Sequence, residues 1–391
     1  MKKQFVAGII VALLAACQSE KPSSGLITID VTGNHPELKL TLQDLLDVEY
    51  IALETTDDFL TQGGVESIGE KYIVVRNWHQ DGDIFFFDRQ TGRAIRKINR
   101  KGEGSEEYSR ITKIILDEVN NELFVGDLMT SKILVYDLEG VHKRTLKLPE
   151  DCRNWSIYPF NNEHLIAYDH SATYNPGSDR EDKSYHLIFS KKDGNIVKGI
   201  YIPYEKVKSL MVEAGNNVAV PKLDAIAPHK EDFFFTEPSS DTVYYFNTKN
   251  QALTPYLVKE STSKPEKVLK MGVVTNRYCV MSTTEIKFDF SKGSGFPISY
   301  LVYDKQTNRL HKASVSNADF INGQQGVLIE NLQQGDIAAI QVLQSHRLVE
   351  AYESGKIQNE TLKKIVSGLN EESNPVIMIM KHKKADAEAT K

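Results

Sequence analysis

An apolar run occurs five times in this sequence, and ionisable side chains follow each copy at a matching position. Carboxylates dominate the set, and two histidines accompany them. If the repeats surround an axis, these positions converge on one face as an acidic rim suited to a cation, a basic peptide or sugar hydroxyls. The alternative is that the Asp residues and nearby Thr side chains bond the backbone of tight turns. The candidate binding residues are Arg76, His79, Asp127, Asp169, His170, Glu237 and Glu285.

Nearby aromatic residues and glycines have a chemical and a structural interpretation. Trp78, Trp155 and Tyr174 are candidates for stacking on a sugar ring, with packing between repeats as the alternative. Gly102-x-Gly104 lacks the third glycine and the following helix of a dinucleotide-binding motif, so it is interpreted as a structural loop. No catalytic residue, metal ligand or cofactor is predicted, because the sequence contains no G-x-S-x-G, HExxH or CxxC motif.

A repeated pair of strands sets these positions. In each copy, an apolar run precedes an aromatic and β-branched strand, a polar residue, and then a Gly or Asn that permits a hairpin turn. The polar residues that close the aromatic strand are 49 to 57 positions apart: Asp88, Asp137, Ser190, Asn247 and Asp304. The upstream runs are 72–75, 123–125, 165–168, 233–235 and 278–281. These runs are apolar without alternation, which predicts strands buried on both faces.

Strands buried on both faces arise when small sheets stack around an axis, so the predicted fold is an all-β, six-bladed β-propeller of four-stranded blades. A β-sandwich would alternate more clearly, and repeats of this length are too long for a β-helix. The sixth blade is expected from 325–343, 375–382 and the N-terminal strand 48–53, with Tyr50–Leu53 pairing with Val376–Met380 to close the ring. Helical spacing marks a small insert in this last blade, around 362–369, and a short segment at 38–46.

The N-terminus has the features of a lipoprotein signal peptide. Lys2 and Lys3 precede an apolar stretch, and Leu14-Ala15-Ala16-Cys17 resembles a lipobox, whose cysteine thiol takes up a diacylglyceryl group. An ordinary secretory signal is the alternative. The predicted division is 1–16 signal peptide, 17–25 tether, 26–383 propeller and 384–391 polar tail. The expected location is the cell envelope, with lipidated Cys17 holding the protein on the outer membrane.

Composition excludes several classes of protein. The 391 residues include 47 Lys and Arg against 53 Asp and Glu, so no basic surplus exists for nucleic acid, and none is predicted as a partner. With 40% hydrophobic and 26% charged residues, the chain is neither a multi-span membrane protein nor disordered. Cys152 and Cys279 belong to different repeats, so free thiols are expected rather than a disulfide.

Three motifs resemble a known family. The segments 49–58 and 102–108, and the closing Asn374-Pro375-Val376-Ile377 after a helical insert, are similar to segments of the uncharacterised six-bladed β-propeller lipoproteins of the Gram-negative cell envelope. In the second motif Ser105 replaces the usual Pro. The resemblance covers roughly residues 26–383 and implies the fold and the location, since the family has no settled activity to transfer.

These observations predict a lipid-anchored envelope propeller that binds a ligand or a partner without catalysis. The expected partner is an envelope protein, a peptide or a glycan. The alternative is a propeller enzyme, a lyase, lactonase or glycan hydrolase, which needs at least three His, Asp or Glu side chains within reach at the channel mouth. A structural subunit of an envelope complex is a third possibility.

Replacing Cys17 with Ala should release the protein from membranes or leave the precursor uncleaved. The thiol is the expected acylation site, and each buried CH₂ of an acyl chain contributes roughly 0.8 kcal/mol to membrane binding. Metabolic labelling with a palmitate analogue, followed by membrane fractionation, measures the effect. Cys152→Ala is the matched control and should stay labelled and membrane-bound. A wild-type protein that takes up no label would contradict the prediction.

Overall fold

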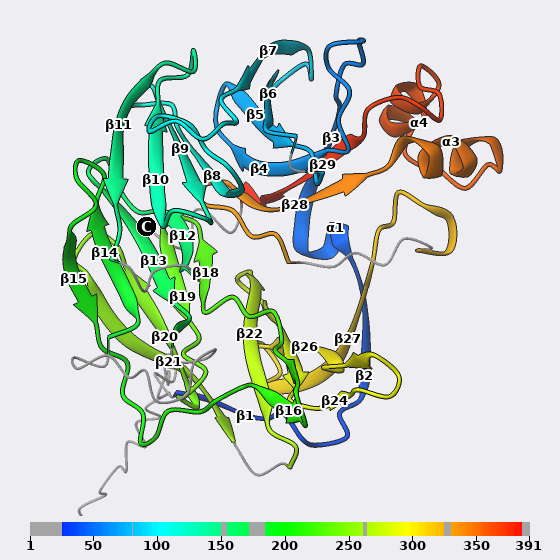
Figure 1. The fold of residues 1–391 in the computed structure, drawn as a ribbon. Coiled ribbons are helices and arrows are strands. Elements are labelled where there is room, and N and C mark those ends of the chain that lie inside the picture. Colours follow the sequence, from blue (N-terminus) through cyan, green and yellow to red (C-terminus); the bar gives the residue numbers. More distant parts are fainter. Residues whose placement is uncertain are drawn as a thin grey trace, which may run out of the picture.

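The repeated apolar runs form sheets that stand around one axis, as the computed structural model shows (Figure 1). The structure describes residues 26–79, 81–149, 155–171, 184–260, 264–323 and 330–384. The prediction of a mainly β, six-bladed propeller is confirmed. The predicted signal peptide and tether, with Cys17, lie outside the described residues, as do Cys152 and Tyr174.

Blades 1 to 3 are four-stranded antiparallel sheets, each made of consecutive strands. Blade 1 contains β4 (Gly64–Ile68), β5 (Tyr72–Arg76), β6 (Asp83–Asp88) and β7 (Ala94–Asn99). Blade 2 contains β8 (Ile111–Asp117), β9 (Glu122–Asp127), β10 (Lys132–Tyr136) and β11 (His142–Lys147). Blade 3 contains β12 (Trp155–Pro159), β13 (His164–Asp169), β14 (His186–Ser190) and β15 (Ile196–Ile200).

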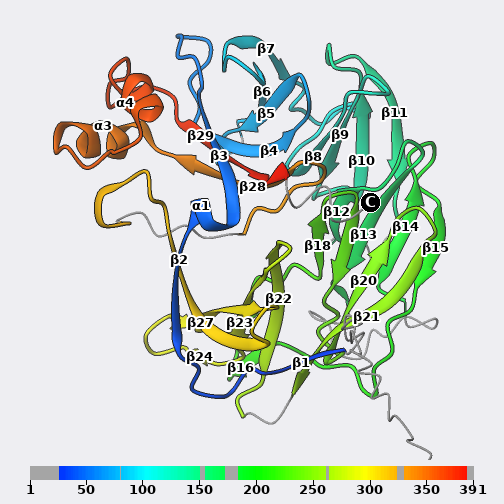
Figure 2. The ribbon, with the colours of Figure 1, turned by 180° about the vertical axis from the view of Figure 1, so that it is seen from behind.

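Blades 4 and 5 each gain a fifth strand from the N-terminal segment. Blade 4 contains β18 (Ile226–His229), β19 (Asp232–Phe235), β20 (Thr242–Asn247) and β21 (Ala252–Glu260), and β1 (Ile27–Asp30) pairs in parallel with β21. Blade 5 contains β22 (Lys267–Val274), β23 (Tyr278–Glu285), β26 (Ile298–Asp304) and β27 (Arg309–Ser316), and β2 (Glu37–Thr41) pairs in parallel with β27. The N-terminal segment therefore runs along the outer edges of both blades (Figure 2).

Blade 6 joins the two ends of the chain. Its sheet has the order β28 (Ile337–Leu343), β29 (Val376–His382) and β3 (Leu46–Ala52). β29 and β3 are antiparallel, with Ala52 opposite Val376 and Val48 opposite Met380, which confirms the predicted ring closure. Leu332 forms a bridge to Ala339 on the other side of β28, where the fourth strand is expected.

Each blade interface buries its own apolar cluster, which explains why the strands lack alternation. In blade 1, Ile73 and Val75 pack with residues of blade 6, while Val74 between them packs with residues of blade 2. Phe85 and Phe86 divide between the two interfaces in the same way. Successive side chains of a strand point to opposite faces, so two neighbouring blades require both faces to be apolar.

The remaining elements are short. Two small hairpins lie outside the blades, β16 (Val212–Ala214) with β17 (Asn217–Ala219), and β24 (Phe288–Asp289) with β25 (Ser294–Gly295). A 3-10 turn occupies Ile321–Gly323. The insert of blade 6 forms α3 (Ser345–Glu353) and α4 (Glu360–Val366), which stand at the edge of the ring (Figure 1). Among the described residues, no helix is long and apolar enough to cross a membrane.

The expectation of a helix over 38–46 is wrong for most of that segment. Its first part is β2, and only α1 (Leu42–Leu45) is helical. The backbone of β2 pairs with the edge strand of blade 5, a tertiary contact that overrides local periodicity. Thr41 and Asp44 form a capping box, and this fixes the point at which the helix begins.

The segment around Gly102 and Gly104 is a structural loop between blades 1 and 2, as predicted. The Glu107 carboxylate accepts a hydrogen bond of 2.9 Å from the backbone N–H of Gly104. The hydroxyl of Tyr108 donates to the carbonyl of Gly82 in blade 1 at 2.7 Å. Cys279, in blade 5, is a buried free thiol whose pKa burial raises to about 12.

Gly92→Ala should destabilise the ring by considerably more than Gly215→Ala. Both glycines have positive φ, 72° and 59°, so both variants share a conformational cost of about 1–2 kcal/mol. A Cβ at Gly92 would lie 1.9 Å from the carbonyl oxygen of Ala52, where blade 1 meets the closing strand β3, whereas nothing lies within 4 Å at Gly215. Overpacking adds roughly 1–3 kcal/mol at Gly92 alone.

Urea unfolding of the two variants beside the wild type measures this difference in the free energy of unfolding. Equal losses of stability in the two variants would show that the turn at Gly92 does not press on β3.

Candidate functional site

A cavity of about 270 Å³ lies on the propeller axis. The first strand of blades 1 to 5 supplies one wall each, and residues 330–333 supply the wall from blade 6. Converging strands leave a central space that no single blade can fill, which makes the axis of a propeller a natural ligand site. Residues from the six blades that line it include Val65, Lys113, Tyr158, Ile226, Lys270 and Leu332.

Three lysines and two carboxylates line this axial cavity: Lys113, Lys222, Lys270, Asp224 and Glu330. The ammonium of Lys270 donates to the Asp224 carboxylate at 2.6 Å. Burial raises the pKa of Asp224, but the charges of Lys270 and Lys222 outweigh it and hold the pKa below its ordinary value. Asp224 is therefore ionised at neutral pH, and the cavity contains a fixed ion pair.

A second set of charged side chains connects blades 1 and 2 beside the cavity. The Glu66 carboxylate accepts from Arg76 Nε at 2.7 Å and from the backbone N–H of Ile114 at 3.2 Å. Lys113 Nζ lies 3.9 Å from the same carboxylate and donates to the Glu66 carbonyl oxygen at 3.1 Å. Arg76, a predicted binding residue, is thus held in an ion pair that is almost fully buried.

The Asp127 carboxylate bonds the backbone of a turn, which is the alternative to ligand binding for this residue. Its carboxylate accepts hydrogen bonds from the backbone N–H groups of Arg110 and Met129 and from the hydroxyls of Ser109 and Thr130. Burial raises the pKa of this carboxyl, but the four hydrogen bonds prevail and lower it. The side chain fixes the geometry of the chain at the end of β9.

His170 and Glu237 belong to one buried cluster between blades 3 and 4. The Tyr168 hydroxyl donates to the Glu237 carboxylate at 3.2 Å, and the ring of Tyr168 lies 4.8 Å from that of His170 between centroids. His186 Nδ1 lies 4.0 Å from the other Glu237 oxygen. His170 Nε2 is 2.9 Å from the Ser156 hydroxyl. This cluster is named the interblade polar cluster below.

Burial sets the protonation of the interblade polar cluster. It raises the pKa of Glu237 to about 7 and lowers the pKa values of His170 and His186 to about 4 and about 3. Each shift favours the neutral form, because a charge in a site without water is costly. Between about pH 4 and pH 7, a protonated carboxyl and two neutral imidazoles therefore face one another.

The other predicted residues are dispersed. Asp169 is fully buried and accepts from the Ser171 backbone N–H at 2.9 Å. Glu285 ends β23 opposite Lys267 of β22. His79 is exposed, and so is Trp78. Trp155 packs against Phe189 with 5.7 Å between ring centroids. The structure thus joins His170 and Glu237 of the predicted set through their shared contacts with Tyr168, and their binding role remains a prediction.

Sequence reasoning missed the charged residues of the cavity. Lys113 and Lys270 lie within the first strands of blades 2 and 5, whereas the predicted residues lie at or after the ends of the second strands. The available signal was a lysine inside a strand that is otherwise apolar, as in Leu269-Lys270-Met271. His186 gives the same signal at the start of β14. Within the described parts of the chain, no group of three or more His, Cys, Asp or Glu residues could hold a metal ion.

Comparison with known proteins identifies relatives of the fold. The model of a domain of unknown function, DUF4934, matches residues 26–381. A crystal structure of a "putative exported protein" from Bacteroides fragilis NCTC 9343 superposes with a TM-score of 0.58 at 13% identity, covering 92% of this chain and 100% of that one. A DUF4221 family member from Bacteroides vulgatus ATCC 8482 gives a TM-score of 0.47 at 10% identity, covering 87% of this chain and 99% of that one. No curated protein matches.

Glu237→Gln should change the pH dependence of stability. The folded protein retains the Glu237 proton up to about pH 7, whereas the unfolded chain loses it near pH 4.5. The wild type therefore loses stability across this window as the pH rises, at ~1.4 kcal/mol per unit, and the glutamine variant does not. The difference in unfolding free energy between the variant and the wild type should shift in favour of the variant by a few kcal/mol between pH 4.5 and pH 8.

Urea unfolding at a series of pH values measures this comparison, and the histidine contributions cancel because both proteins contain them. Glu231→Gln, an exposed glutamate in the same blade, is the control. A difference between variant and wild type that is constant with pH would contradict the neutral cluster.

Proposed function

This chain belongs to the DUF4934 family, and we propose that it is a lipid-anchored protein of the cell envelope that binds an acidic saccharide in its axial cavity. The single observation that supports binding is the cavity itself, to which all six blades contribute side chains. A site built by every blade is positioned by the whole ring, so its geometry is rigid before the ligand arrives.

The chemistry of the lining supports the class of ligand. Three lysines face two carboxylates, and the pair of Asp224 and Lys270 satisfies one of each. Lys113 lies 3.9 Å from the Glu66 carboxylate, so the exposed Lys222 is the residue of the lining that favours a ligand with a negative charge. Hydroxyl and amide groups that suit sugar hydroxyls line the same space: Tyr158, Ser282, Thr284, Asn331 and Gln333.

The proposed location has separate support. The sequence Leu14-Ala15-Ala16-Cys17 resembles a lipobox, which favours a lipid anchor at the outer membrane. The related fold from Bacteroides fragilis belongs to a protein named as exported. A tether of residues 17–25 would hold the propeller away from the lipid surface, where an envelope glycan is within reach.

Lys222→Gln should weaken the binding of an acidic saccharide about tenfold, which corresponds to roughly 1.4 kcal/mol. The side chain lines the cavity and is exposed, so its loss should leave the fold intact. Calorimetric titration with oligogalacturonates, beside neutral galactose oligomers of equal length, measures the affinity. Lys206→Gln is the matched control, since Lys206 is also exposed and lies in the same segment between blades 3 and 4.

Equal affinity for the acidic and neutral oligomers, or equal losses in the two lysine variants, would contradict the proposal. Chromatography of the recovered saccharide tests the alternative of an enzyme, since turnover would shorten or alter it.

A further inference from the structure

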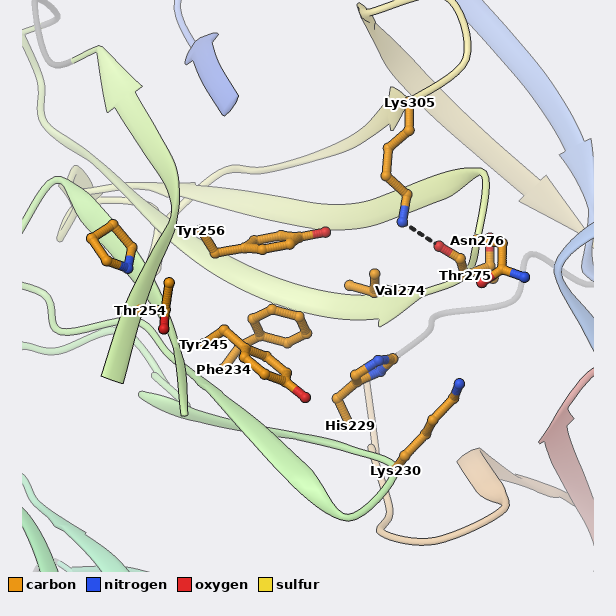
Figure 3. Close-up of a pocket in the computed structure, with 11 residues that line it drawn as sticks. His229, Lys230, Phe234, Tyr245, Thr254, Tyr256, Val274, Thr275, Asn276 and Lys305 are labelled. Carbon is orange, nitrogen blue, oxygen red and sulfur yellow. Dashed lines mark hydrogen bonds between the residues drawn. The ribbon is translucent and has the colours of Figure 1, made fainter. Parts of the chain in front are cut away.

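A second cavity, of about 430 Å³, lies between blades 4 and 5 and is named the blade 4–5 pocket here. Its residues come from the β18–β19 turn, strands β19, β20 and β21, the β22–β23 turn and the start of the turn after β26 (Figure 3). The lining of the axial cavity shares no residue with the lining of this pocket. The two cavities can therefore be altered separately.

Aromatic rings form the wall of the blade 4–5 pocket. The ring of Phe234 lies 4.8 Å from Tyr256, 5.5 Å from Tyr245 and 5.3 Å from His229 between centroids. The Tyr245 hydroxyl is held by a hydrogen bond to Asp232, which fixes the orientation of that ring. Flat, rigid apolar walls of this kind suit a planar ligand, because rings stack with little loss of conformational freedom.

The charged side chains that line the pocket are both lysines, while the nearby Asp232 carboxylate is bonded to the Tyr245 hydroxyl. Lys230 and Lys305 enter from opposite edges (Figure 3), and the ammonium of Lys305 donates to the carbonyl of Thr275. His229 is neutral, since burial and then the positive groups nearby, His382 first among them, lower its pKa to about 3. Among the described residues, no Asp or Glu lines the pocket. Two ammonium groups beside an apolar wall favour an anion over a neutral or cationic ligand.

We propose that the blade 4–5 pocket binds an organic anion with a flat aromatic or polycyclic body and one carboxylate or sulfonate group. The body lies against Tyr245 and Tyr256, with the buried Phe234 packed against both rings, and the anionic group lies between Lys230 and Lys305. Stacking supplies the affinity, and the lysines select the charge. This site is independent of the axial cavity and of the saccharide proposed for it.

Binding of 1-anilinonaphthalene-8-sulfonate to the folded full-length protein tests the proposal. Its fluorescence should rise in a saturable, one-to-one manner below the unfolding temperature. Lys230→Gln and Lys305→Gln should each weaken binding three- to tenfold, whereas Lys305→Arg should retain it. Lys192→Gln, an exposed lysine in blade 3, is the control and should have no effect. The uncharged N-phenyl-1-naphthylamine should bind the wild type and both glutamine variants equally.

Thr254→Trp provides a second test that does not depend on charge. Thr254 lines the pocket from an exposed position opposite Tyr245, so a larger side chain should fill the cavity without disturbing the core. Binding of both dyes should fall at least tenfold, and thermal unfolding should confirm that the variant is folded. Dye binding that survives Thr254→Trp, or that falls equally in Lys192→Gln, would overturn the proposal. Loss of dye binding in Lys222→Gln would assign the dye to the axial cavity instead.

Discussion

The backbone pairing of β29 with β3 is the interaction on which the rest of this structure depends. It brings Ile377 and Ile51 side by side, although most of the chain separates them in sequence. Without it, blade 6 would present a row of unpaired backbone groups, and the apolar faces of blades 5 and 6 would meet water. The closing strand β3 belongs to a longer N-terminal segment. The earlier strands of this segment, β1 and β2, pair with the outer strands of blades 4 and 5.

Closure imposes burial on both faces of every blade, and this determines where polar groups are tolerated. Six apolar clusters fill the interfaces, and the interface between blades 3 and 4 also contains a polar cluster. Glu237, Tyr168 and His186 are tolerated there because burial raises the pKa of the carboxyl to about 7 and keeps the imidazole neutral, which limits the buried charge. Buried ions elsewhere have partners, as with Lys191 and Asp117 at 2.6 Å between blades 3 and 2.

Closure also creates two kinds of cavity. The axial cavity exists because the first strands converge without filling the centre, and its lining includes the ion pair of Lys270 and Asp224 from neighbouring blades. The blade 4–5 pocket exists because turns of two neighbouring blades diverge at the edge of an interface, which leaves Tyr245 and Tyr256 partly exposed. The first cavity is polar and the second is aromatic, so the same ring offers two chemically distinct surfaces.

The sequence by itself determined the repeat, the blade number and the strands that close the ring, because recurring runs such as Ile73-Val74-Val75 require apolar contacts on both faces of each strand. It placed Asp127 and Glu237 at the ends of second strands, but it could not tell a turn cap from a ligand, since that depends on hydrogen bonds from Ser109 and Tyr168. Only the tertiary structure decided which side chains surround the axis. Lys113, Asp224 and Lys270 come from different blades, and their proximity follows from the closed ring rather than from any local pattern.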